Sequence, residues 1–117
     1  MRKINFLVFL LVFCFIGFAA KTATAQMPGG YNSVNKNDPQ VKAAARYAVT
    51  TQSKRAGHSI TLISISKAEQ QVVAGMNYKV CLKVSDRKRT RWATAVVYRD
   101  LKGGRSLTSW DWGACNW

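Results

Sequence analysis

A single helix-forming segment followed only by strand-forming segments is the feature that most constrains the fold of this chain. The segment "DPQVKAAARYAVTTQSKRAG" begins with Asp38, a favourable N-cap, and Pro39, which suits the first helical position. Gly57 at its end can close a helix in a left-handed conformation. Apolar residues recur at helical spacing between these signals, namely Val41, Ala44, Ala45, Ala48 and Val49. The segment therefore predicts a helix over residues 39–56.

Four strand-like segments come after this helix, joined by short links: "SITLISIS", "MNYKVCLKV", "WATAVVYRDL" and "RSLTSW". In the second segment one face carries apolar side chains, namely Tyr78, Val80, Leu82 and Val84, and the other carries Lys79, Cys81 and Lys83. The third segment is apolar on both faces, so its pattern does not say which face is inward. Strands in series with short links pair antiparallel, and one helix covers only one face of such a sheet. The sequence therefore predicts an α+β fold.

The N-terminus has the pattern of an export signal. A positively charged start precedes the apolar run "FLVFLLVFCFIGFAA", and small residues at Ala23 and Ala25 suit a processing enzyme. The run is short for a membrane anchor, the rival interpretation, which needs roughly 20 apolar residues. We expect residues 1–25 to be a cleaved signal peptide and the protein to be secreted, to the extracellular space or the periplasm.

Removal of residues 1–25 from the 117-residue chain leaves 92 residues, enough for one small domain. Residues 26–37, "QMPGGYNSVNKN", are polar and predict a flexible or extended N-terminal arm, so that the domain proper spans 38–117. The leader carries three basic residues and no acidic one, so the formal charge falls from +13 to +10. Such a charge favours anionic partners, although a scattered basic surface also serves solubility.

Cys81 and Cys115 remain after the leader and Cys14 are removed. In an exported protein two cysteines most often form one disulfide, and the alternative is two free thiols. If Cys81 and Cys115 are bridged, closing the loop between them lowers the chain entropy of the unfolded state. The folded state is then expected to be stabilised by roughly 4 kcal/mol.

The sequence lacks the residue groups that catalysis needs. It has one histidine, His58, and five acidic residues with no close pair for acid–base chemistry. No cysteine or histidine spacing indicates a metal site, and no glycine-rich loop is placed to hold a phosphate. We therefore expect no enzyme activity, no cofactor and no metal. Nucleic acid is not an expected partner, because the basic residues are scattered and the chain carries an export signal.

Three motifs in order give this chain a resemblance to a known family. They are "PGG" at Pro28–Gly30, "NDPQVKAAARYAV" at the start of the predicted helix, and "QVVAG" at Gln71–Gly75. The last agrees with a Gln-x-Val-x-Gly signature at every specified position. The chain resembles the cystatins, inhibitors of papain-like cysteine proteases, over nearly the whole mature length. The resemblance implies one long helix packed on and wrapped by a four- to five-stranded antiparallel sheet.

The resemblance also implies a protease-binding wedge made of the glycine arm and two hairpin loops. Family spacing puts the second loop at "DLKGG", where many cystatins carry Pro-Trp and this chain does not. The disulfide departs as well, because secreted animal cystatins usually tie the tail to the penultimate strand and Cys81 lies one strand earlier. The implied protease-binding residues are Gly29, Gly30, Gln71, Val72, Val73, Ala74, Gly75, Leu101, Lys102 and Gly103.

Two functions remain open at this point. The first is reversible, tight-binding inhibition of papain-like, cathepsin-type cysteine proteases by a monomer. The second is a non-inhibitory binding module of cystatin fold for anionic partners or surfaces, which the charge and the missing Pro-Trp favour. Salt distinguishes them, since screening weakens binding between charges and leaves an apolar contact largely intact.

Overall fold

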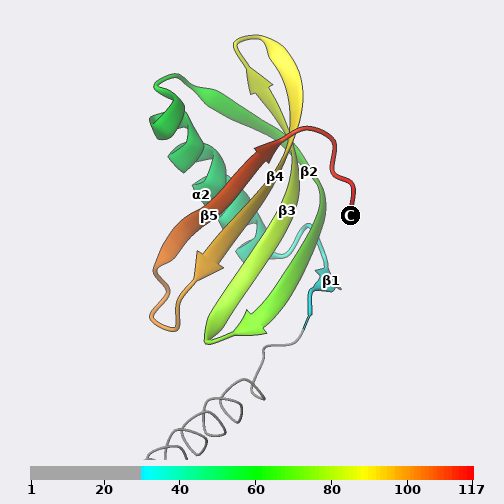
Figure 1. The fold of residues 1–117 in the computed structure, drawn as a ribbon, viewed down its shortest axis with the longest axis vertical. Helices are drawn as coiled ribbons and strands as arrows, with labels where there is room; N and C mark the ends of the chain where they lie inside the picture. Colours follow the sequence, from blue (N-terminus) through cyan, green and yellow to red (C-terminus); the bar gives the residue numbers. More distant parts are fainter. Residues whose placement is uncertain (1–29) are drawn as a thin grey trace, which may run out of the picture.

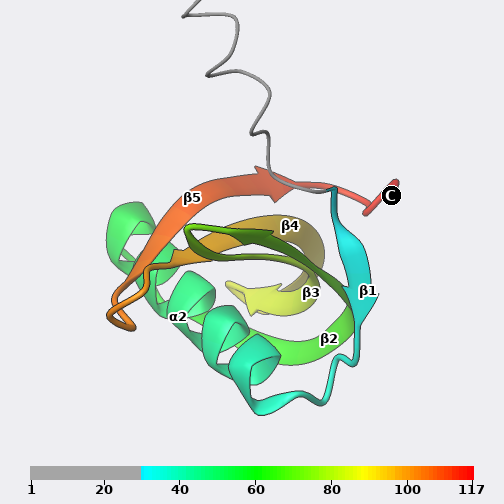
Figure 2. The ribbon, with the colours of Figure 1, turned by 90° about the horizontal axis from the view of Figure 1, so that it is seen from below.

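The computed structural model describes residues 30–117, so the predicted signal peptide and Gly29 lie outside the described residues (Figure 1). The elements, in chain order, are β1 (Asn32–Val34), α2 (Pro39–Ala56), β2 (Ile60–Val73), β3 (Gly75–Asp86), β4 (Arg89–Arg99) and β5 (Arg105–Trp112). The five strands form one antiparallel sheet in the order β1-β2-β3-β4-β5. The sheet curves around α2, as Figure 2 shows, and this confirms the predicted α+β class.

The helix begins and ends where its capping residues predict. Asp38 Oδ1 accepts a hydrogen bond from the backbone N–H of Gln40 at 2.8 Å. Gly57 has a φ of 75° and donates its N–H to the carbonyl of Ser53 at 3.0 Å. Within the described chain, no helix is long and apolar enough to cross a membrane.

The core lies between the small apolar face of α2 and the concave face of the sheet. The alternating set of β3 is buried as predicted, with Val80, Leu82 and Val84 fully enclosed. The alanines on the facing side of α2 are short and let the sheet approach the helix closely. In β4, whose pattern was ambiguous, Ala95 and Val97 face the core. Packing against α2 therefore determines which face of β4 is inward, which its apolar pattern leaves open.

The N-terminal arm is extended over part of its length. Residues 32–34 form the strand β1 and pair with Ala68, Glu69 and Gln70 of β2. The backbone of this segment is therefore held by the sheet edge. The short strand determines where Gly30 lies relative to the rest of the molecule.

Cys81 and Cys115 form a disulfide, with their Cα atoms 6.0 Å apart. The bridge holds the C-terminal tail on the sheet face opposite α2. There Trp117 donates its indole N–H to Thr94 Oγ1 at 2.9 Å, and the ammonium groups of Lys67 and Lys79 lie 4.3 and 4.4 Å from its ring centre. Of the two alternatives for the cysteines, the structure has the bridged form.

The turn between β3 and β4 contains an ion-pair cluster that the sequence did not predict. Asp86 is 8 % exposed, and its two carboxylate oxygens lie 2.6 Å from His58 Nε2 and 2.7 Å from Arg91 Nη1. The hydrogen bonds from Arg91 and then His58 lower the pKa of Asp86 below its ordinary value. The single histidine of the chain is therefore part of an ion pair with Asp86.

Candidate functional site

The predicted "QVVAG" segment is a tight hairpin between β2 and β3. Val73 pairs directly with Gly75, which leaves Ala74 alone at the turn. Gly75 has a φ of 111°, a conformation that side-chain-bearing residues rarely adopt. The segment closes the hairpin at one end of the sheet.

The end of β4 supports the tip of this first hairpin. The Tyr98 hydroxyl donates a hydrogen bond to the carbonyl of Ala74. A Cβ added to Gly75 would collide with the Arg99 carbonyl oxygen and lie 3.0 Å from the Tyr98 hydroxyl. Gly75 is therefore required by a neighbouring strand as well as by its own backbone angle. The sequence by itself does not indicate Tyr98 or Arg99 at this site, because no local pattern shows which strand passes beside the glycine.

The first hairpin keeps its apolar side chains accessible while its polar ones are paired. Gln71 Oε1 accepts a hydrogen bond from Asn77 Nδ2 at 3.0 Å across the hairpin. Val72 is 63 % exposed, and Ala74 is exposed at the turn, whereas Val73 is half-buried. The tip is thus an ordered surface with an apolar side chain directed to solvent.

The predicted second loop joins β4 to β5 at the same end of the molecule, as Figure 1 shows. Asp100 organises it, because its Oδ1 accepts hydrogen bonds from the backbone N–H groups of Lys102 and Gly104 at 2.9 and 2.8 Å. Gly103 has a φ of 92° and donates its N–H to the Asp100 carbonyl. Leu101 is left 83 % exposed at the tip.

The two tips lie side by side and share a shallow groove of about 300 Å³. Its lining includes Val72 and Gly75 from the first hairpin and Arg99, Asp100 and Leu101 from the second. Arg99 Nε is buried there with no hydrogen-bond partner. The structure therefore brings together the two hairpin segments that the resemblance implied.

Gly30 is exposed at the start of the described chain. Because β1 runs antiparallel to β2 and Asn32 pairs with Gln70, the residues before Asn32 lie toward the first hairpin turn. We call Gly30, the turn at 71–75 and the loop at 101–103 the hairpin edge. Gly29, the remaining predicted contact, is outside the described residues.

The chemistry available at the hairpin edge is that of contact rather than catalysis. Its exposed side chains are aliphatic, apart from Lys102, and none is a nucleophile. Among residues 30–117, no three His, Cys, Asp or Glu side chains come together as possible metal ligands. The arrangement suits insertion of two apolar tips into a complementary cleft.

Known proteins are similar to this chain over most of the described residues. Residues 34–112 match a family model described as "Aspartic acid proteinase inhibitor". "Salivary cystatin-L2" of Ixodes scapularis is 34 % identical over 92 % of this chain and 96 % of its own length. The chain belongs to the cystatin family.

Further relatives agree with this cystatin assignment in sequence and in fold. "Putative cysteine proteinase inhibitor 7" of Oryza sativa subsp. japonica is 33 % identical over 76 % of this chain and 80 % of its own length. The crystal structure of the salivary cystatin of the soft tick Ornithodoros moubata superimposes with a TM-score of 0.65 at 23 % identity, and covers 75 % of this chain and all of that one. The name of the Oryza sativa relative describes an inhibitor, in agreement with the expectation, from the missing catalytic groups, that this chain is not an enzyme.

Proposed function

We propose that this cystatin is a reversible inhibitor of papain-like cysteine proteases, which binds as a wedge with its hairpin edge in the enzyme's active-site cleft. The observation that carries the proposal is the pair of adjacent, ordered tips that expose Val72 and Leu101. Docking such tips buries apolar surface with little loss of conformational entropy, because hydrogen bonds already hold both loops. No peptide bond of the inhibitor needs to be cut.

The proposed contacts are Gly29, Gly30, Gln71–Gly75 and the loop from Leu101 to Gly103. In the second loop Leu101 stands where many cystatins carry the bulkier Pro-Trp pair, so one aliphatic side chain supplies the apolar contact. Gly30 has no heavy atom within 4 Å of an added Cβ. Its value is therefore in allowing close approach to an enzyme surface and not in the fold. One copy carries all of these groups, which supports action as a monomer.

The direct test is titration of papain and of a cathepsin with the protein that begins at Gln26. Inhibition that can be reversed by dilution and that persists at high salt is expected, because the contact is mainly apolar. Absence of inhibition of both enzymes at micromolar concentrations would reject the proposal.

Inhibition of an aspartic protease is the second candidate, because the matched family model carries that description. Pepsin therefore belongs in the same titration, and inhibition of pepsin without inhibition of papain would favour this candidate. A protein that inhibits neither enzyme and binds polyanions only at low salt would instead be the non-inhibitory module that the charge of +10 favours.

We propose secretion as the location of this activity. Support comes from the leader-like sequence of residues 1–25, from the word "salivary" in the names of relatives, and from the disulfide, which is typical of oxidising compartments. N-terminal sequencing of the protein recovered from culture medium tests it, with Gln26 as the expected first residue. Recovery of the chain only in a reducing compartment would oppose it.

A further inference from the structure

A second feature lies away from the hairpin edge, on the side of β2 that does not face β3. The short strand β1 covers only Ala68–Gln70 of that side. The backbone N–H and carbonyl of Ile60 are also hydrogen-bonded, in this case to the Ser53 hydroxyl, and are not free to pair with another strand. Between these points no strand of the described chain pairs with residues 61–67 on this side. The backbone there is an open sheet edge that can pair with an added strand.

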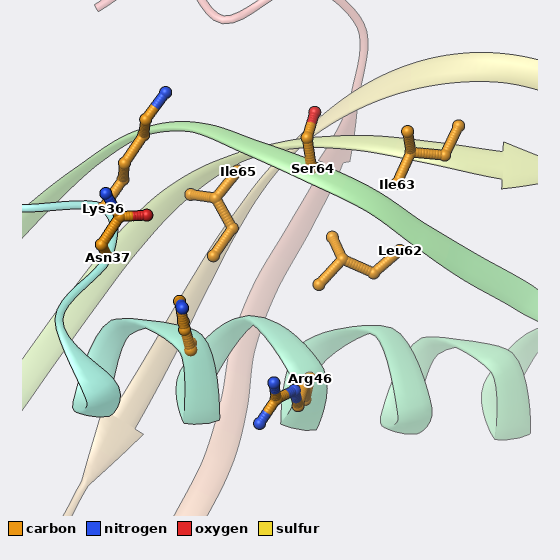
Figure 3. Close-up of a pocket in the computed structure, with 8 residues that line it drawn as sticks. Lys36, Asn37, Arg46, Leu62, Ile63, Ser64 and Ile65 are labelled. Atoms are coloured by element: carbon orange, nitrogen blue, oxygen red, sulfur yellow. The ribbon is translucent and has the colours of Figure 1, made fainter.

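This open edge borders a groove of about 530 Å³ between α2 and β2, which we call the β2 groove. Figure 3 shows Leu62 and Ile65 pointing from β2 toward the helix, where they form an apolar floor. Ile63, on the same strand, is 49 % exposed. The groove therefore combines apolar surface with an open backbone edge.

The remaining walls of the β2 groove are positively charged. Lys36 comes from the loop before α2, and Lys42 and Arg46 come from the helix. None of the lining residues is acidic. A ligand of complementary chemistry therefore carries negative charges beside apolar groups.

The spacing of the cations fits an extended peptide. Lys42 and Arg46 are four positions apart on α2, which corresponds to about 6 Å along a helix axis. Alternate residues of a strand are separated by roughly 6.6 Å and project to the same face. Acidic side chains at every second position of an added strand can thus meet both cations, and the intervening side chains face outward near Ile63.

Two irregularities of β2 limit the length of such a strand. The pairing with β3 shifts between Leu62 and Ser64 and again between Ile65 and Lys67. Bulges of this kind bend a strand and interrupt a regular ladder. The edge accordingly suits a short segment and not a long added strand.

A second copy of this protein is a poor occupant, because the chain without residues 1–25 carries a formal charge of +10 and its copies repel one another. We propose that the β2 groove is a docking site for a short, extended segment of a partner protein in which acidic and apolar residues alternate. It is separate from the hairpin edge, so the partner can be bound whether or not a protease is.

The probe is a fluorescent hexapeptide of alternating glutamate and valine, titrated into the protein that begins at Gln26 and followed by anisotropy. Slower hydrogen exchange of β2 amides between Thr61 and Lys67 is expected on binding. The double variant Lys42→Ala/Arg46→Ala is expected to bind the peptide roughly tenfold more weakly, as for the loss of two partly exposed ion pairs. The matched control Lys54→Ala/Arg89→Ala removes two exposed cations elsewhere and is expected to keep native affinity.

A second peptide, in which proline replaces each valine, has the same charge but lacks the backbone N–H group at each replaced position. Equal binding of the proline peptide would overturn strand addition, and equal losses in the groove and control variants would overturn a specific site. Failure of the hexapeptide to bind at about millimolar concentration would also reject the proposal. Vesicles of anionic lipid form the last arm, and loss of vesicle binding by the groove variant without loss of peptide binding would assign the groove to membranes instead. Protease inhibition, measured in parallel, is expected to be unaffected in every variant.

Discussion

Truncation of the two exposed tips tests the proposed inhibitory contact without disturbing the fold. Leu101 is 83 % exposed and Val72 is 63 % exposed, so neither side chain contributes much to the core. Alanine at either position is expected to change the free energy of unfolding by less than about 0.5 kcal/mol. Any loss of inhibition then reports on the contact with the enzyme.

The magnitude follows from the surface that each tip can still bury. Leucine to alanine removes three carbon atoms, each worth about 0.8 kcal/mol when it is transferred from water. Scaled by its exposure, Leu101→Ala is expected to lose about 2 kcal/mol of binding energy, or roughly 30-fold in the inhibition constant. Val72→Ala removes two carbons from a less exposed side chain and is expected to lose about 1 kcal/mol, or roughly fivefold.

The assay is the inhibition constant for papain, from progress curves, beside a thermal denaturation curve for each variant. Ile63→Ala is the matched control, since this aliphatic side chain is 49 % exposed but lies on the β2 groove. It is expected to inhibit like the native protein. The loss should appear mainly as faster dissociation. Native inhibition constants for both tip variants, or an equal loss in the Ile63 control, would refute the reasoning.

Three further predictions concern stability. Gly75→Ala is expected to unfold at lower denaturant concentration than the native protein, because Gly75 has a positive φ and the Arg99 carbonyl leaves no room for a Cβ. Gly30→Ala is the control and should match the native curve. Equal curves for the two variants would contradict the requirement for glycine at position 75. Asp86→Asn is expected to be less stable than the native protein at pH 7. The difference in unfolding free energy should shrink as the pH falls below the ordinary aspartate pKa of 3.8, because the pKa of Asp86 is lowered in the folded state. Urea denaturation at several pH values measures this difference, and a constant difference would argue against the ion pairs. Replacement of both Cys81 and Cys115 by serine is expected to cost roughly 4 kcal/mol of unfolding free energy, measured against the native protein without reductant, and a loss below about 1 kcal/mol would mean that the bridge constrains the unfolded chain little.

Local sequence signals were enough for the elements with local causes. The helix bounds follow from Asp38, Pro39 and Gly57, since caps act on neighbouring backbone groups. The inward face of β3 follows from its strict alternation, because the period of a strand is two. The "QVVAG" hairpin and its relation to the other segments followed from the family motif.

Contacts between distant segments could not be read locally. One ion pair of Asp86 depends on His58, which lies 28 positions away, and no local pattern of the sequence relates the two residues. The strand nature of residues 32–34 depends on an open edge of β2, since three residues cannot form a strand alone. The hydrogen bond from Tyr98 to the first hairpin could not be predicted either, because it also joins segments that are distant in the sequence.

The sequence by itself therefore determined the kinds of element, their order, the face of β3 that is buried and the family. Each of these depends on periodicity, on capping or on a contiguous motif. Tertiary structure alone decided that Tyr98 supports the turn at Ala74, that Gly75 has no room for a side chain, and that the edge of β2 stays open beside three cations. These properties arise when curvature of the sheet brings strand ends and helix faces together, and no stretch of the chain encodes such proximity on its own.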